Sequence, residues 1–337
     1  MTPPDAPQRK VAGGHSVSRT RDKRNRLRVA EPVLLVASRH YGMYGLRVKS
    51  ELDLPGWPTL TVDEPDVTIR QEVCSAPDVK GEPYTARLLV EAGELKLVVL
   101  GVGRYCASGG SLIRVDPDAG AKGEDLRLYL TGAMLGTILH QRGAFPLHAS
   151  CVALNGVGVA LAGRSGSGKS TLVAAMVNRG ASFVTDDIAV VVSLGAEGGF
   201  AVWPGAARVK LDQIGLAALP SPFRNLEPAG GTRGKFHVPM NSPTDWTSPV
   251  PLSRIYLLTY GEGPARVERL TGLDAISAVV DETYFLTYAR AMGLTAQVFQ
   301  LAATVARILP VMRLIRPRGL EHLPAVVDLL ELDGRNP

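Results

Sequence analysis

The sequence predicts a mixed α/β protein, in which a small, mainly antiparallel β domain precedes a larger domain built around a phosphate-binding loop. Short runs rich in β-branched residues, separated by Pro/Gly turns, fill residues 31–120. A buried-strand pattern, a glycine-rich loop and a helix pattern then follow in that order near the middle of the chain. Helix and strand patterns continue toward the end, so we expect the second domain to span residues 121–335. A length of 337 residues fits two domains.

Residues 1–30 differ in composition from the rest of the chain. The segment 1–28 holds eight Lys and Arg against two Asp, whereas the whole chain has a net charge of +5, so the remainder is nearly neutral. Because large apolar residues are almost absent, we expect 1–30 to be a disordered basic tail. Such a tail could contact nucleic acid, anionic lipid or an acidic peptide, or could simply be solvated. Apart from such contacts, the sequence gives no indication of a nucleic-acid partner.

The predicted first domain contains five strand patterns and no cluster of catalytic residue types. Each pattern is short, and the connections have the length of hairpins, which favours antiparallel pairing. The patterns cover residues 33–37, 44–48, 67–70, 87–90 and 95–100. We therefore expect this domain to serve recognition or scaffolding.

A complete G-x-x-x-x-G-K-[ST] motif is the strongest functional signal in the chain. It consists of Gly163, Arg164, Ser165, Gly166, Ser167, Gly168, Lys169 and Ser170. The run 157–162 before it is typical of a buried strand, and the run 171–179 after it is typical of a helix. Glycines let backbone N–H groups turn toward an anion, and a helix N-terminus favours negative charge. We therefore expect ATP or GTP here, with Lys169 on the β- and γ-phosphates, Ser170 on Mg²⁺ and Thr171 completing the site.

The segment before the loop places a histidine beside it. We expect a helix over 124–141, a strand over 147–154 and a hairpin turn at Asn155-Gly156, a strong turn signal between apolar runs. The hairpin would bring His148, near the end of its strand, beside the strand that carries the loop. A neutral histidine of the core is the alternative to a functional role.

Two adjacent acids, Asp186 and Asp187, form the second functional signal. Asp186 follows Lys169 by only 17 residues, so a single strand–helix–strand unit returns the pair to the loop. Adjacent carboxylates repel each other, so a purely structural role would require a partner for each. We expect the pair to bind Mg²⁺ or to transfer a proton, with a structural turn as the alternative.

Basic residues after the acid pair could stabilise phosphate charge. Arg208 and Lys210 alternate in a strand pattern, which would put them on one face. Residues 219–251 are dense in Pro, Gly and Ser and contain Lys235, so we expect a long mobile loop that could cover bound phosphates. Ordinary solvated charges are the alternative for each of these cations.

The C-terminal part returns to regular structure, and no segment indicates a membrane span. The patterns predict strands over 255–258 and 311–315 and helices over 271–280 and 320–330. The most apolar late segment, 296–315, is interrupted by polar and basic residues. Three scattered cysteines indicate neither a disulfide framework nor a zinc site, so a cytoplasmic location is the simplest expectation.

The histidine, the phosphate loop and the acid pair occur in an order that resembles the catalytic domain of HPr kinase/phosphorylase over residues 146–192. A looser likeness to the HPr-kinase-like proteins of bacterial peptide-modification clusters, including lasso peptide kinases, extends along nearly the whole ordered chain. It rests on residues 44–46, 55–56, 101–104, 140–143, 147–150, 204–205, 208–211 and 316–318. The resemblance implies the P-loop fold that HPr kinases share with phosphoenolpyruvate carboxykinases.

The resemblance also implies an activity and site roles. The protein would be a kinase that uses ATP and Mg²⁺ to phosphorylate a hydroxyl, foremost a Ser of a small peptide or protein. One of Asp186 and Asp187 would accept the proton of that hydroxyl and the other would assist the metal. His148 would position the acid pair through a hydrogen bond.

Two departures and two alternatives accompany this implication. The segment 204–208 stands where the family has a glutamate-containing motif, which argues against phosphorylase activity and a second metal ligand. The first domain also differs from that of HPr kinases, so HPr itself is not the expected substrate. A small-molecule hydroxyl kinase and a nucleotide-gated binding module with weak hydrolysis are the alternatives. A homo-oligomer is compatible with the family.

Overall fold

The computed structural model describes residues 35–61, 64–195, 198–219, 226–231, 234–241 and 245–334. The predicted basic tail, residues 1–30, lies outside these residues. All elements named below belong to one unit, Pro32–Pro337.

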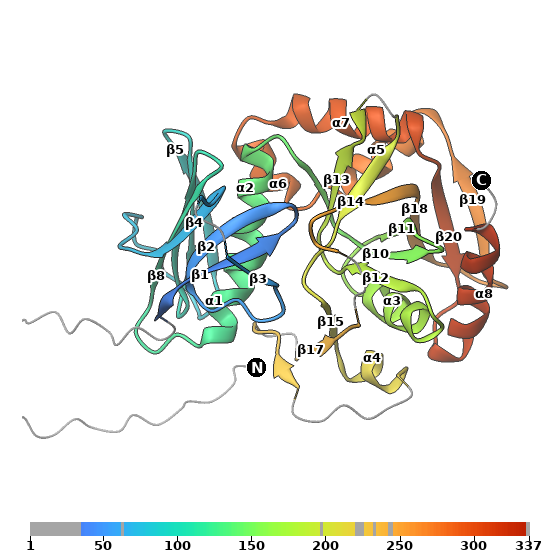
Figure 1. Ribbon diagram of the computed structural model, residues 1–337, viewed down its shortest axis with the longest axis horizontal. Coiled ribbons are helices and arrows are strands. Elements are labelled where there is room, and N and C mark those ends of the chain that lie inside the picture. Colours follow the sequence, from blue (N-terminus) through green and yellow to red (C-terminus); the bar gives the residue numbers. More distant parts are fainter. Residues whose placement is uncertain are drawn as a thin grey trace, which may run out of the picture. The chain divides into compact units, whose positions relative to one another are not determined.

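An eight-stranded, mostly antiparallel sheet forms the first part of the fold, in the order β3-β1-β2-β4-β8-β7-β6-β5 (Figure 1). Its strands are β1 (Leu35–Met43), β2 (Leu46–Leu52), β3 (Thr59–Leu60), β4 (Val67–Gln71), β5 (Ala86–Glu91), β6 (Glu94–Val99), β7 (Gly103–Ser108) and β8 (Leu112–Pro117). The pairs β2–β4 and β4–β8 are parallel, and the others are antiparallel. The prediction of a mainly antiparallel β region at this end of the chain is confirmed.

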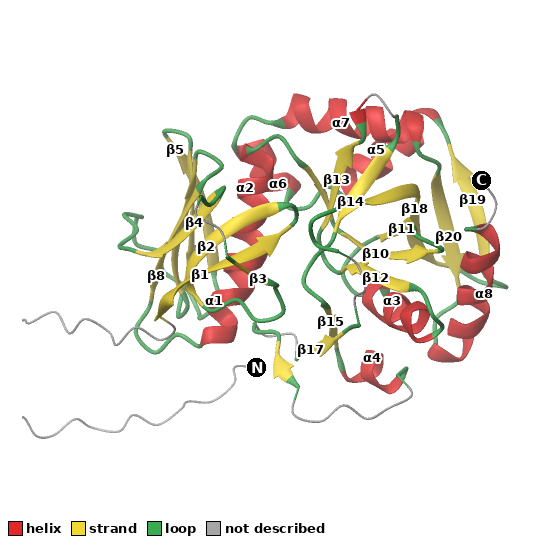
Figure 2. Ribbon diagram, viewed as in Figure 1, coloured by secondary structure: helices red, strands yellow, loops and turns green. Residues whose placement is uncertain are grey.

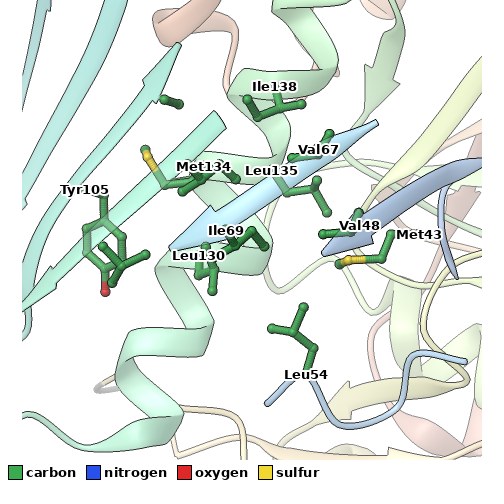
Figure 3. Packing of buried hydrophobic residues seen from close by; sticks show 14 of the residues in the cluster. Met43, Val48, Leu54, Val67, Ile69, Tyr105, Leu130, Met134, Leu135 and Ile138 are labelled. Atoms are coloured by element: carbon green, nitrogen blue, oxygen red, sulfur yellow. The ribbon is translucent and has the colours of Figure 1, made fainter. Parts of the chain in front are cut away.

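One long helical stretch packs on this sheet, and it matches the helix predicted over 124–141. Its parts are α1 (Gly123–Tyr129), the π-helical turn η1 (Leu130–Met134) and α2 (Leu135–Gln141). Figure 3 shows Leu130, Met134 and Ile138 lying among strand residues such as Val48. Burying such a side chain contributes about 1.5–3 kcal/mol relative to exposure. Because the helix shares the core of the first sheet, its position is fixed by the strands that precede it.

A nine-stranded mixed sheet forms the second part of the fold. Its main path is β12-β10-β11-β18-β14-β13-β9, and β20 joins β18 to β19. The strands are β9 (Phe145–Leu147), β10 (Ala149–Leu154), β11 (Val157–Ala162), β12 (Ser182–Thr185), β13 (Ala189–Ser193), β14 (Phe200–Trp203), β18 (Val250–Tyr260), β19 (Arg266–Leu270) and β20 (Val311–Arg316). Strand β18 is parallel to β11 and β20, so the carboxyl ends of these three strands lie at one edge.

Helices cover both faces of the second sheet (Figure 2). They are α3 (Lys169–Asn178), α5 (Gly272–Asp281), α6 (Leu286–Ala291), α7 (Thr295–Ile308) and α8 (Leu323–Asp333), with the short 3-10 turn η3 (Leu320–His322) before α8. Along β11, Val159 and Leu161 pack with α3 and α8, whereas Ala160 and Ala162 pack with α5 and α7. Successive residues of a strand face opposite sides, so a strand covered on both sides is an uninterrupted apolar run.

The predicted hairpin before the loop forms, with one difference at His148. Strands β10 and β11 are antiparallel, and Asn155 and Gly156 in the turn have φ values of 51° and 83°. The predicted strand over 147–154 is wrong in one respect, because it divides at His148. Strand β9 pairs with β13, whereas β10 pairs with β11 and β12, so the chain changes partners between them.

A three-stranded sheet in the order β15-β17-β16 lies beside the acid pair. Its strands are β15 (Arg208–Leu211), β16 (Glu227–Pro228) and β17 (Phe236–Pro239), and α4 (Gln213–Ala217) follows β15. The segment 219–251, predicted as a loop, therefore contributes two strands that pair, β16 and β17, and the first two residues of β18. Residues 220–225, 232–233 and 242–244 lie outside the described part of the chain, and the mobility of the segment stays a prediction.

Candidate active site

The phosphate loop joins the end of β11 to the start of α3, as the motif predicts. Gly163, Gly166 and Gly168 have φ values of 141°, 85° and 85°, which only glycine adopts readily. A Cβ atom on Gly168 would also lie 2.4 Å from the Arg316 guanidinium. The loop therefore needs its glycines both for its turn and for the close approach of Arg316.

Lys169 is buried at the base of the loop. Its Nζ donates to the Gly163 carbonyl oxygen and, at 3.4 Å, to that of Arg164. Burial lowers the pKa of Lys169, while the charges of Asp187 and Glu282 act against this shift. A cation held by two loop carbonyls can exchange these acceptors for phosphate oxygens.

Two arginines and a tyrosine lie on the α8 side of the loop. The Arg316 guanidinium donates to the Ser167 carbonyl oxygen and lies 4.8 Å from the ring centre of Tyr260. The Arg318 guanidinium lies 4.1 Å from the same ring, and the Tyr260 hydroxyl donates to the Gly166 carbonyl at 3.3 Å. This end of the site offers cations and a flat ring next to the loop, and the loop motif alone did not indicate it.

The two adjacent acids have different surroundings. Asp186 accepts hydrogen bonds from the Ser170 hydroxyl (2.8 Å), the Ser150 hydroxyl (2.6 Å) and the Lys210 backbone N–H (2.9 Å). Asp187 instead forms an ion pair of 2.9 Å with the Lys210 ammonium. Asp186 is thus fixed against the loop by several donors, whereas Asp187 has one cationic partner among the described residues.

A tight turn separates the directions of the two carboxylates. The Ile188 N–H donates to the Asp186 carbonyl at 3.0 Å, which closes a γ-turn centred on Asp187. Asp187 has a φ of 74°, a strained value for a residue other than glycine. The Thr185 hydroxyl donates to the Ile188 carbonyl at 2.7 Å and braces the turn. Such strain persists only where neighbouring contacts hold it, and it is frequent in functional sites.

Burial and charge set the ionisation of this region. Burial would raise the pKa of Asp187, but the neighbouring basic groups, Lys210 foremost and Lys169 among them, together outweigh burial and hold that pKa well below its usual range. Burial lowers the pKa of His148 to about 4, and the charge of Lys169 acts in the same direction. At neutral pH, Asp187 is therefore a carboxylate and His148 a neutral imidazole.

His148 does not make the hydrogen bond expected from the resemblance. Its ring stacks on Tyr284 with the ring centres 5.7 Å apart, and its backbone N–H donates to the Glu282 carbonyl at 2.7 Å. Within the described residues, no hydrogen bond joins the ring to either aspartate. The interruption between β9 and β10 nevertheless places His148 in the lining of the same cleft as Asp187.

The three predicted cations have different positions. Arg208 and Lys210 do lie on the same face of β15, and Lys210 reaches Asp187. Arg208 is turned away: it pairs with Glu227 at 3.5 Å, and Arg127 of α1 pairs with the same carboxylate at 2.7 Å. Lys210 and Lys235 line the cleft, whereas Arg208 does not.

Two residues that were not expected in the site support the loop and the acid turn. The Glu282 carboxylate, at the end of α5, accepts from the Gly163 N–H at 3.0 Å. The Tyr44 side chain, in the β1–β2 hairpin, is buried beside Thr185 and close to Asp187. The left-handed φ of Tyr44 and the following Gly45 indicates a tight turn, but no local signal says what the turn contacts.

A cleft of about 690 Å³ connects these groups. Its lining includes Tyr260, Arg318 and Leu323 on the α8 side, and Tyr84, Leu128, Tyr129 and residues 229–231 on the α1 side (Figure 1). The loop, Lys169, Ser170, both acids, Lys210 and His148 also line it. The structure therefore brings all the predicted residues of the loop, the acid pair and His148 into one region, with Arg208 outside it.

The residues present fit a nucleotide with a magnesium ion. The Ser167 hydroxyl is buried inside the loop without a hydrogen-bond partner among the described residues, as expected if phosphate supplies one. Ser170 and Asp186 offer a hydroxyl and a carboxylate next to each other, the oxygen ligands that Mg²⁺ prefers. No group of three or more His, Cys, Asp or Glu side chains in the described ranges could hold a metal. Mg²⁺ usually completes its shell with phosphate and water oxygens.

The loop at the end of a buried strand and the acids beside it define the class of domain, a P-loop domain. Residues 143–204 match the family model of the HPr serine kinase C-terminal domain, a span that includes the loop, His148 and both acids. Among solved structures, the chain is similar to the Hpr(Ser) kinase/phosphatase from Coxiella burnetii, with 12% identity and a TM-score of 0.29. That similarity covers 56% of this chain and 90% of the other. No curated protein sequence gives a significant match.

The described helices are all too short or too polar to cross a membrane.

Proposed function

We propose that this protein is an ATP- and Mg²⁺-dependent kinase that transfers the γ-phosphate to a hydroxyl, namely a Ser of a small peptide or protein. The family match to the HPr serine kinase C-terminal domain supports a serine-directed kinase. The finer resemblance, to the HPr-kinase-like proteins of peptide-modification clusters and to the fold of phosphoenolpyruvate carboxykinases, is part of the proposal.

The division of roles within the acid pair carries the proposal. Asp186 is held by the hydroxyls of Ser150 and Ser170 and would hold Mg²⁺ together with Ser170. The γ-turn points the Asp187 carboxylate in another direction, and among the described residues only the Lys210 ammonium donates to it. A nucleotide sensor needs only the first carboxylate, whereas a kinase also needs the second near the acceptor.

Each remaining group has a role in binding or orientation. Lys169 and the loop N–H groups would bind the phosphates, and Tyr260 with Arg318 would border the nucleoside. Bound Mg²⁺ would neutralise phosphate charge. Asp187, ionised at neutral pH, would accept a hydrogen bond from the acceptor hydroxyl and then its proton.

Bound nucleotide would change the electrostatics of the cleft. Without phosphates, Lys210 lowers the pKa of Asp187. Phosphate charge would draw Lys210 and Lys235 toward itself and would raise that pKa, so that the carboxylate becomes a better proton acceptor only when nucleotide is present. Neutral His148 lines the same cleft and adds no charge beside this carboxylate.

The direct test is intact-mass analysis of Ser-containing peptides incubated with the protein, ATP and Mg²⁺. We expect a gain of one phosphate with wild-type protein and none with Lys169→Ala. Substituting GTP for ATP tests the nucleotide. Wild-type protein that binds nucleotide yet phosphorylates neither peptides nor small hydroxyl compounds would overturn the proposal in favour of a nucleotide-gated binding module.

A further inference from the structure

The end of the cleft near α1 is built differently from the nucleotide end. Its lining comes from Tyr84, from Leu128 and Tyr129 of α1, and from the backbone of residues 229–231. All three side chains are partly exposed, and the Asp125 carboxylate next to them is buried. We call Tyr84, Leu128 and Tyr129 the apolar wall.

A single buried carboxylate holds the apolar wall together. Asp125 is only 4% exposed. It accepts from the Tyr84 hydroxyl at 2.9 Å and from the Gly231 N–H at 2.6 Å. It therefore fixes one side chain of the wall and the neighbouring backbone at the same time.

The backbone on both sides of Asp125 is specialised. Tyr84 has a φ of 65°, a strained conformation for an aromatic residue. Gly230 lies so close to α1 that a Cβ atom there would be 2.4 Å from the Glu124 carbonyl oxygen. Strain and close approach of this kind persist only where surrounding contacts impose them. The wall is thus a constructed feature and not an incidental surface.

The position of the wall assigns it to the acceptor. The nucleotide phosphates must lie at the loop, and the nucleoside would lie near Tyr260. An acceptor hydroxyl that reaches Asp187 would then enter from the α1 side of the cleft, next to the wall. We infer that the apolar wall of Tyr84, Leu128 and Tyr129 binds an apolar or aromatic side chain adjacent to the acceptor Ser of a peptide. This inference rests on the proposed kinase function and names the substrate feature that it recognises.

The test uses synthetic peptides that differ only beside the acceptor Ser, with Phe or Gly at either flanking position. For wild-type protein we expect kcat/KM to be about tenfold higher for one Phe peptide than for its Gly counterpart, the usual gain from a filled apolar subsite. Leu128→Ala and Tyr129→Ala should each reduce this ratio, chiefly through the KM for peptide. Their nucleotide affinity and melting temperature should stay close to wild type.

Matched variants separate recognition from general damage. Leu332→Ala removes an exposed leucine far from the cleft lining and should leave the Phe/Gly ratio unchanged. Asp125→Ala should release Tyr84 and Gly231 and lower the ratio as Leu128→Ala does, whereas Asp125→Asn, which keeps an accepting oxygen, should retain part of it.

The outcomes distinguish this inference from the proposed function. Phosphate transfer at equal kcat/KM to the Phe and Gly peptides would overturn the inferred role of the apolar wall and would still support the proposed kinase function. If wild-type protein phosphorylates no hydroxyl, anisotropy of the same peptides carrying fluorescein still tests the wall. Tighter binding of the Phe peptide, lost in Leu128→Ala, would support it, and equal binding would overturn it.

Discussion

The two ends of the cleft are built from different parts of the sequence. At the nucleotide end, the backbone that would bind phosphate comes from one continuous segment, residues 163–170, whose glycine spacing shapes it around an anion. The acceptor end depends on residues from distant segments, such as Tyr84, Asp125 and Gly231, joined by tertiary hydrogen bonds. The phosphate-binding half of such a site is therefore local chemistry, whereas the half that selects the acceptor is a product of packing.

The largest expected effect comes from separating the two acids. Asp187→Asn should reduce phosphate transfer by about 10²–10⁴-fold, because it removes the proton acceptor. Its nucleotide affinity should stay close to wild type. Asp186→Asn should instead weaken Mg²⁺-dependent nucleotide binding. Nucleotide titration and transfer assays on both variants check this, and transfer at the wild-type rate by Asp187→Asn would show that the two roles are wrongly assigned.

A second prediction concerns His148, the neutral histidine in the same cleft as the two acids. Its pKa of about 4 in the folded protein lies below the usual value of 6.5. Between these values the unfolded chain binds a proton that the folded protein does not, so the free energy of unfolding falls as the pH decreases. His148 should contribute a loss of about 2 kcal/mol between pH 7 and pH 5.

Urea unfolding of wild type and His148→Gln at the two pH values measures this contribution. The variant should lose less stability on acidification than wild type does. His322→Gln, at a partly exposed histidine, is the control and should follow wild type. Equal pH dependence of wild type and His148→Gln would refute the burial of a neutral imidazole.

A third prediction concerns whether nucleotide binding by the loop depends on a residue distant in sequence. Glu282 lies far from the loop in sequence but accepts from the Gly163 N–H. Glu282→Ala should weaken nucleotide binding by about tenfold, the order expected for losing a hydrogen bond to a charged group. Glu282→Gln keeps an accepting oxygen and should be affected less. Asp281→Ala, at the exposed neighbouring residue, serves as the control. Unchanged nucleotide affinity in Glu282→Ala would show that the loop binds nucleotide without support from Glu282.

The smallest expected effect is at the hairpin of the first sheet. Tyr44→Phe removes the hydroxyl beside Thr185 but keeps the buried ring, so the turn at Asp187 should loosen slightly. We expect kcat to fall by about threefold, within the range for a lost neutral hydrogen bond, with the KM for nucleotide unchanged. Steady-state kinetics of Tyr44→Phe, with Tyr288→Phe as the control, measure this effect. An unchanged kcat in Tyr44→Phe would show that the Tyr44 hydroxyl does not support the turn at Asp187.

Some features of this protein follow from its sequence alone. The loop, the strand before it and the helix after it form as predicted, because glycine spacing and apolar runs act over a few residues. The Asn155-Gly156 turn and the return of the acids to Ser170 follow for the same reason, since one short strand–helix–strand unit leaves little freedom.

Other features were decided by the tertiary structure. The sequence put Arg208 and Lys210 on one face, but only packing turned Arg208 toward Glu227 and left Lys210 on Asp187. Likewise, no local pattern could split a strand at His148, since that break depends on which strands pair with β9 and β10. Partner choice between distant segments is set by burial and hydrogen bonding across the whole fold, which spacing along the chain does not encode.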